Sequence, residues 1–141
     1  MFVDLAGSTE LAEQRDVEET RDILLAFLDT CSARIEAAHG YVARFMGDGV
    51  LAYFGYPEAH PEAAALALHA AQEIQSAMGK LRLSDGRELR ARVGVATGEV
   101  MVGDIVGRGG AAECMVVGAA ANLAARLQSV AKPGTVLACA T

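Results

Sequence analysis

Two short segments of the chain each place one aspartate beside glycines and an apolar, β-prone run. Residues 2–9 read FVDLAGST and carry Asp4, and residues 45–55 read FMGDGVLAYFG and carry Asp48. Carboxylate oxygens are the ligands that hard divalent cations such as Mg²⁺ prefer. If the two segments are neighbouring strands, Asp4 and Asp48 can hold a pair of magnesium ions. The chemistry indicated is nucleotidyl transfer by two-metal catalysis.

The loop after Asp4 could hold the phosphates of such a substrate. Residues 5–9 lead directly into a predicted helix, and the first N–H groups of a helix have no intrahelical acceptor. Together with the helix dipole, these groups favour an anion. Gly7 lets the backbone pass close to a phosphate. The predicted phosphate-binding residues are Ala6, Gly7, Ser8 and Thr9.

Each aspartate also has a simpler explanation. Asp4 could be a turn or helix-entry residue, and Asp48 an ordinary hairpin aspartate, because Asp-Gly between β-prone runs is typical of hairpins. Two such elements in one small domain are a coincidence that a shared metal site would explain.

Size and charge limit the class of protein. The chain has 141 residues, is 52% hydrophobic and 21% charged, and carries a net charge of −6. These values predict a single domain spanning residues 1–141. A folded acidic domain is a poor candidate for binding nucleic acid through its phosphates. A metal–nucleotide ligand needs only local positive charge, so the acidity does not count against it.

Cysteine usage and hydropathy indicate a cytoplasmic protein without a membrane segment. Cys31, Cys114 and Cys139 have no metal-ligand spacing and read as reduced core thiols. No apolar run is long enough to span a bilayer, and no signal peptide precedes Asp4. Because strand-like residues begin at once after Met1 and end just before Thr141, we expect a fragment of a longer chain.

Periodicity and turn residues predict an α+β sandwich with a mostly antiparallel sheet and helices packed on it. Ser8 or Thr9 is the expected N-cap of the first helix, and Gly40 the left-handed residue that ends the second. Hairpins are expected around Asp48 and around residues 97–99. Helices are predicted from residue 8 or 9 and over 17–38, 62–78 and 119–130, and strands over 2–5, 41–45, 50–54, 89–96, 100–106, 114–117 and 135–139.

Four motifs resemble the class III adenylate/guanylate cyclase catalytic domain. They are FVDLAGST (2–9), GDGVLAYFG (47–55), VGVATGEVMVGDI (93–105) and VGAAANLAARLQ (117–128). They occur in the order that the family has, and the resemblance extends from residue 2 to about residue 138.

The resemblance implies a palm-like, ferredoxin-related fold and a head-to-tail homodimer with active sites at the subunit interface. It implies a phosphorus–oxygen lyase that converts ATP or GTP to the 3′,5′-cyclic nucleotide and pyrophosphate, using two Mg²⁺ or Mn²⁺ ions. Asp4 and Asp48 would be the metal ligands, with the backbone carbonyl of Leu5. From the partner subunit, Asn122 would orient the ribose and Arg126 would stabilise charge on the α-phosphate.

The spacing of Asn122 and Arg126 agrees with this assignment. Residues four apart lie on one face of a helix, while Leu123 and Leu127 are expected to face the core. A guanidinium suits the task because it stays ionised and offers several fixed donors. Without the family context, a surface or ion-paired arginine is the favoured interpretation of Arg126.

Two positions implied to read the purine depart from the family's usual residues. Adenylate cyclases commonly carry lysine and then aspartate or threonine there, and guanylate cyclases glutamate and cysteine. Here the residues are Arg44 and Met115. Arginine can donate to a purine ring nitrogen or to guanine O6, whereas methionine is a poor acceptor. Alternatively, Arg44 pairs with an acid across the dimer and Met115 only packs. ATP is favoured over GTP, and the choice stays open.

The family's domain usually continues beyond Thr141 with a hairpin that carries a lysine for the triphosphate. That lysine is not in this chain, and its absence, together with the two unusual purine positions, favours an alternative function. In it, the chain is a catalytically weak or inactive module that binds nucleotide or dimerises to regulate tethered domains. Polymerase-like transfer has no support, because the acidic chain offers no template groove.

Overall fold

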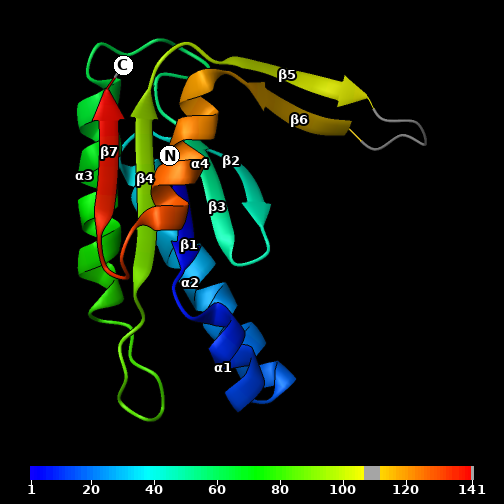
Figure 1. The fold of residues 1–141 in the computed structure, drawn as a ribbon, viewed down its shortest axis with the longest axis vertical. Coiled ribbons are helices and arrows are strands. Elements are labelled where there is room, and N and C mark those ends of the chain that lie inside the picture. Colours follow the sequence, from blue (N-terminus) through cyan, green and yellow to red (C-terminus); the bar gives the residue numbers. More distant parts are fainter. Residues whose placement is uncertain (107–111, 141) are drawn as a thin grey trace.

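A five-stranded sheet forms the centre of the molecule (Figure 1). The computed structural model describes residues 1–106 and 112–140, with the backbone alone at residues 104–106, 112–115 and 140. The strand order is β2-β3-β1-β4-β7, and every pairing is antiparallel except the parallel pair β4–β7. The strands are β1 (Phe2–Leu5), β2 (Tyr41–Met46), β3 (Gly49–Tyr53), β4 (Ala91–Thr97) and β7 (Val136–Ala140).

Helices cover both faces of this sheet. The long helices α2 (Val17–Ala37) and α3 (Ala63–Met78) share one face, and α4 (Ala119–Val130) lies on the other. A short helix, α1 (Ser8–Gln14), follows β1 directly. The predicted α+β class, with a mostly antiparallel sheet and helices packed on it, is confirmed.

The main core lies between the sheet and the α2–α3 layer. Val3 of β1 and Val93 of β4 are paired across the two strands, and both side chains lie in this core. Because successive strand residues point to opposite faces, the residues next to them point away from it. On α2, the fully buried residues are Phe27, Cys31 and Ile35. Their spacing of four residues keeps them on one side of the helix, and the charged residues between them, Asp29 and Arg34, are exposed.

On the opposite face, α4 rests directly on the backbone of β4. A Cβ atom at Gly94 would lie 2.1 Å from the carbonyl oxygen of Ala124 and 2.4 Å from the backbone nitrogen of Gln128. Only a residue without a side chain allows so close an approach. Gly94 therefore sets the height of α4 above the sheet.

One predicted hairpin is wrong. Residues 89–96 and 100–106 were expected to pair, but β5 (Met101–Val106) pairs with β6 (Ala112–Val117) in a separate antiparallel ribbon. Both edges of β4 are already occupied, by β1 and by β7. The chain therefore turns away after β4, and the β5–β6 ribbon extends from the main body (Figure 1).

Two predicted helix ends also differ. The N-cap of α1 is Gly7, at φ 74°, and not Ser8 or Thr9, because the Ser8 hydroxyl donates to the Asp48 carboxylate instead. The left-handed residue after α2 is His39, at φ 62°, rather than Gly40. Gly40 is required for packing, since a Cβ there would lie 2.6 Å from Cγ2 of Ile35.

Within the described ranges, no helix combines the length and the apolar character needed to cross a membrane. Cys31 is a free thiol and is fully buried. The side chain of Cys114 lies outside the described residues.

The contact at Gly94 predicts a large effect from one added methyl group. Gly94→Ala should lower the free energy of unfolding by about 3 kcal/mol, because the new Cβ forces α4 away from β4. Gly103→Ala is the matched control, since nothing lies within 4 Å of a Cβ at that strand position. Urea unfolding of both variants measures the difference. Equal stability of the two variants would contradict the packing described for α4.

Burial of Cys31 predicts a dependence of stability on alkaline pH. Burial raises the pKa of its thiol from 9.0 to about 12. Between these values the unfolded chain releases a proton that the native chain keeps, so stability falls as pH rises, by up to about 1.4 kcal/mol per pH unit. Urea unfolding under reducing conditions should show a shallower fall for Cys31→Ala than for wild type. Parallel pH profiles would show that the thiol is not buried as described.

Candidate active site

The fold brings Asp4 and Asp48 together. Asp4 lies on β1 opposite Gly49 of β3, and the N–H of Leu5 donates to the carbonyl oxygen of Asp48 at 3.2 Å. The segments around the two aspartates are therefore paired neighbours, which is the condition that the sequence analysis set for a shared metal site. This pairing is the geometric condition for a metal site shared by both carboxylates.

The Asp4 carboxyl group is held in an unfavourable setting for a free anion. Its Oδ1 atom is buried and has no hydrogen-bond partner among the described residues. The pKa of Asp4 is raised, chiefly by burial and further by the negative charge of Asp48. The Gln128 amide and the positive charge of Arg92 act in the opposite direction. Like charges close together in a partly buried site favour a bound cation.

Asp48 is fixed by its own turn and by α1. The turn passes through Gly47 at φ 59°, a backbone conformation that favours glycine. A Cβ at Gly49 would lie 2.9 Å from the carbonyl oxygen of Val3, so the turn fits closely against β1. The Ser8 hydroxyl donates to Oδ2 of Asp48 in a short hydrogen bond. Ser8, which was predicted to bind phosphate, thus also orients a candidate metal ligand.

The loop predicted to bind phosphate is partly used by the sheet. The N–H of Ala6 donates to the carbonyl oxygen of Arg90 at 2.9 Å, so Ala6 does not offer the free N–H group that the sequence suggested. Strand pairing continues one residue farther than expected and explains the difference. The amides at the start of α1 are those of Gly7, Ser8 and Thr9.

Arg92 belongs to the site and was missed in the sequence. It lies on β4 directly opposite Asp4, and its Nε atom is buried without a hydrogen-bond partner among the described residues. Its positive charge acts on Asp4. The available signal was an arginine inside the strand-like run of residues 89–96, but the pairing register is needed to connect it with Asp4.

Asn122 and Arg126 lie together but away from the aspartates of the same chain. Both are exposed on α4, whereas Ala120 and Ala124 of that helix are buried. Asp4 lies beneath the buried side, where the Gln128 amide approaches it. The predicted shared face of Asn122 and Arg126 is confirmed, and one chain does not bring them to Asp4.

The two predicted purine-binding residues are not brought together within one chain. Arg44 is exposed on β2, the edge strand of the main sheet, beside an irregularity in its pairing with β3. Met115 lies on β6 opposite Gly103, in the separate ribbon, and its side chain lies outside the described residues.

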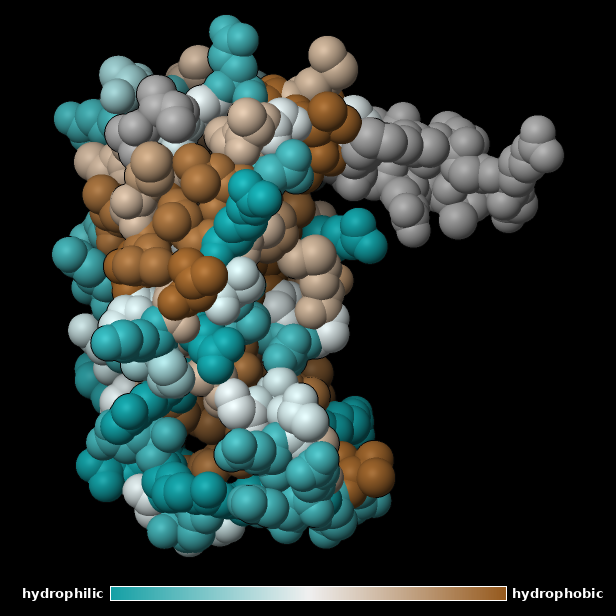
Figure 2. Space-filling view, in the orientation of Figure 1, coloured by the Kyte–Doolittle hydropathy of each residue, from teal (hydrophilic) through white to brown (hydrophobic). Residues whose placement is uncertain are grey.

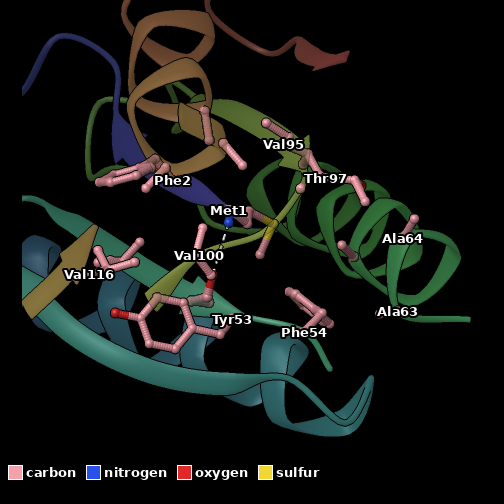
Figure 3. Close-up of a pocket in the computed structure, with 18 residues that line it drawn as sticks. Met1, Phe2, Tyr53, Phe54, Ala63, Ala64, Val95, Thr97, Val100 and Val116 are labelled. Atoms are coloured by element: carbon pink, nitrogen blue, oxygen red, sulfur yellow. Dashed lines mark hydrogen bonds between the residues drawn. The ribbon is translucent and has the colours of Figure 1, made fainter. Parts of the chain in front are cut away.

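Two hollows in the described surface lie elsewhere. One, of about 120 Å³, is bordered by small and apolar residues such as Val95, Val100 and Ala120, and no charged side chain lines it (Figure 3). The other, of about 200 Å³, is lined in part by Ala6 and Gly7 of the predicted phosphate-binding loop. Neither hollow is lined by Asp4 or Asp48. The paired carboxylates therefore lie outside the lining of both hollows.

A third ligand side chain is absent from this pair. The described ranges hold no cluster of three or more His, Cys, Asp or Glu side chains that could bind a metal ion. Two carboxylates nevertheless suit Mg²⁺, which commonly uses one or two of them together with water and substrate phosphates. The unpartnered oxygen of Asp4 fits such an ion, and the donors are hard oxygen atoms throughout.

Comparison with known proteins identifies the family. The model of the family described as "Adenylate and Guanylate cyclase catalytic domain" matches residues 1–141. The chain belongs to this family. Relatives include the uncharacterized protein Rv1320c of Mycobacterium tuberculosis, which is 38% identical over 134 residues, covering 94% of this chain and 22% of that protein. The chain thus spans about a quarter or less of the curated relatives that it matches.

Solved cyclase structures share the fold. The adenylyl cyclase CyaB from P. aeruginosa is 29% identical, with a TM-score of 0.89 over 97% of this chain and 73% of that chain. The guanylyl cyclase Cya2 is 30% identical, with a TM-score of 0.88 over 97% of this chain and 71% of that chain. Because both kinds of cyclase match equally well, the fold alone does not distinguish ATP from GTP.

The burial of the Asp4 carboxylate and its repulsion by Asp48 predict a gain in stability when the charge of Asp4 is removed. Asp4→Asn should raise the free energy of unfolding of the metal-free chain by about 1 kcal/mol, because a neutral amide costs less to bury than a carboxylate and no longer repels Asp48. Added Mn²⁺ should raise the melting temperature of wild type and leave that of the variant unchanged. Differential scanning calorimetry measures both effects. A destabilised variant that still responds to Mn²⁺ would contradict the assignment of Asp4.

Proposed function

We propose that the chain is the catalytic domain of a nucleotidyl cyclase that converts ATP, in preference to GTP, to the 3′,5′-cyclic nucleotide and pyrophosphate. The observation that carries the proposal is the pairing of Asp4 with Asp48, which leaves a buried carboxylate oxygen without a partner. Membership of the cyclase family supports the same reaction.

Asp4, Asp48 and the backbone carbonyl of Leu5 would hold the metal ions. Two Mg²⁺ or Mn²⁺ ions bound there would supply activation of the ribose 3′-hydroxyl and neutralisation of charge on the triphosphate. The Ser8 hydrogen bond orients the Asp48 carboxylate for this purpose. Ser8 thereby links the metal ligands to the adjacent loop.

Gly7, Ser8, Thr9 and Arg92 would bind the phosphates. The backbone amides at the start of α1 donate to phosphate oxygens, and the positive φ of Gly7 turns the chain there. Arg92 lies opposite Asp4 and adds a fixed positive charge near the carboxylates. This local charge meets the need of a polyanionic substrate in a chain whose net charge is −6.

A second copy of the chain would complete each site. Asn122 and Arg126 are exposed on α4, on the side of the helix away from Asp4 of the same chain. Apolar side chains gather on the face that carries α4 and β7, while the end that carries α1 is mostly hydrophilic (Figure 2). Such a face suits contact with another subunit. We therefore propose a head-to-tail homodimer with two composite sites.

In this dimer, Asn122 and Arg126 would act on the substrate held by the partner's aspartates. The asparagine amide would orient the ribose. The arginine would stabilise the charge that builds on the α-phosphate as the 3′-oxygen attacks and pyrophosphate leaves. A guanidinium suits the role because it stays charged and presents its donors in a fixed plane.

Arg44 supports ATP as the first substrate. An arginine offers only donors, and adenine presents an acceptor at N1, where guanine presents a donor. Guanine O6 can also accept from arginine, so GTP is retained as the second candidate. Met115 adds no side-chain acceptor for either base.

The wider setting is also a proposal. Curated relatives are several times longer than this chain, which supports tethered regulatory domains. A nucleotide substrate and the free, buried thiol of Cys31 support a cytoplasmic location.

An assay of cyclic nucleotide formation tests the proposed function. Wild type should form cyclic product from ATP with Mg²⁺ or Mn²⁺, and faster than from GTP. Asp48→Ala and Arg126→Ala should each be inactive. An equal mixture of the two variants should recover up to about a quarter of wild-type activity, because about half of the dimers are mixed and each mixed dimer has one complete site.

Asp29→Ala and Arg21→Ala are matched controls, since both residues are exposed on α2 and lie outside the proposed site. Both should keep full activity. A mixture that stays inactive would exclude the shared-site dimer. A wild-type chain that binds ATP without forming product would instead favour the non-catalytic nucleotide-binding module, for which Met115 is the supporting observation.

A further inference from the structure

One polar residue of α4 faces the opposite way from Asn122 and Arg126. Gln128 follows Arg126 by two residues, which places its side chain on the other side of the helix. Its Nε2 atom is buried and has no hydrogen-bond partner among the described residues. A buried amide without a partner is costly, so its position needs an explanation.

Gln128 lies above the row of site residues on the sheet. The close contact at Gly94 brings the backbone nitrogen of Gln128 to the surface of β4. Gly94 faces Phe2 across the β1–β4 pairing, and Arg92 faces Asp4 two residues farther along the same strands. The side chain of Gln128 approaches the Asp4 carboxyl group in this arrangement.

Gln128 and Asp4 are chemically complementary. Nε2 of Gln128 is a donor without an acceptor, and Oδ1 of Asp4 is an acceptor without a donor, and both atoms are buried. A small rotation of either side chain would satisfy both groups. Carboxylates that ligate metals are usually fixed by a second hydrogen bond of this kind.

We propose that Gln128 is a positioning residue that holds the Asp4 carboxylate of its own subunit in the orientation that binds metal. This inference rests on the proposed function of Asp4 as a metal ligand. Its consequence is that α4 serves two sites at once. Gln128 supports the aspartates beneath the helix, and Asn122 and Arg126 on the outer side serve the site of the partner subunit.

A neutral amide suits this position better than a charged donor. It donates to one carboxylate oxygen and leaves the negative charge of Asp4 for the cation. A lysine or arginine here would neutralise the carboxylate and compete with the metal. Arg92 already supplies one positive charge opposite Asp4.

Mn²⁺ binding to the 141-residue chain tests the proposal without any turnover. Gln128→Met keeps the length of the side chain and removes the donor, and Gln128→Asn keeps the amide on a shorter stem. Both should weaken Mn²⁺ binding on the order of 10- to 100-fold, measured by titration calorimetry. Gln72→Met, at an exposed position of α3, is the matched control and should bind as wild type does.

Melting temperatures, measured in parallel without metal, separate positioning from folding. At least one Gln128 variant should melt close to wild type and still show the weaker binding. Unchanged Mn²⁺ affinity in a folded Gln128 variant would overturn the proposal. A wild-type chain that binds no Mn²⁺ would overturn it as well.

Mixing experiments identify which site Gln128 serves. If it supports Asp4 of its own subunit, Gln128→Met should recover activity when mixed with Arg126→Ala and should not recover it with Asp48→Ala. The reverse pattern would show that Gln128 acts across the interface and would overturn the proposal. Absence of cyclic product from wild type would refute the proposed function alone, and the Mn²⁺ titrations would still decide the role of Gln128.

Discussion

Asp4 on β1 and Asp48 in the turn that precedes β3 are like charges held close together, and Oδ1 of Asp4 is buried without a hydrogen-bond partner among the described residues. Without a cation this arrangement opposes folding, and β1 is held in it because β3 and β4 pair with β1 on both sides. The hydrogen bond from Leu5 to Asp48 and that from Ser8 to the same residue leave the two acids little freedom to separate. The stability of the sheet thus maintains a local charge repulsion that a bound metal would relieve.

The contact between α4 and Gly94 is the second constraint. A helix that touches strand backbone has its distance from the sheet fixed to within a few tenths of an ångström, because the contact contains no flexible side chain. The contact at Gly94 therefore also fixes the distance from the sheet of three residues of α4: Gln128, Asn122 and Arg126. Belonging to the cyclase family explains why such a helix is present, and the packing explains how its polar residues are held in place.

Local sequence signals were sufficient for much of this description. The Gly-Asp-Gly sequence around Asp48 predicted a hairpin, the apolar run at Asp4 predicted a strand, and the four-residue spacing of Asn122 and Arg126 predicted a shared face. That the two aspartate segments are neighbours was a condition of the metal-site hypothesis, and the register between β1 and β3 was needed to meet it. Features that depend on which strands pair, and in which register, could not be predicted from local sequence. The separate β5–β6 ribbon follows from the occupation of both edges of β4, and the relation of Arg92 to Asp4 requires the register between strands. The sequence predicted a capping role for the Ser8 hydroxyl. Its hydrogen bond to Asp48 joins residues forty positions apart, and no local pattern indicates such a contact.

The orientation of α4 has a consequence for regulation. In a symmetric pair of subunits, a shift of this helix along its axis would disturb the ligands below it and the contacts it offers across the two-fold axis in the same movement. In the proposed homodimer, both composite sites would then lose activity together. Under the same proposal, a tethered domain that changes only the separation or rotation of the two subunits would control both sites at once.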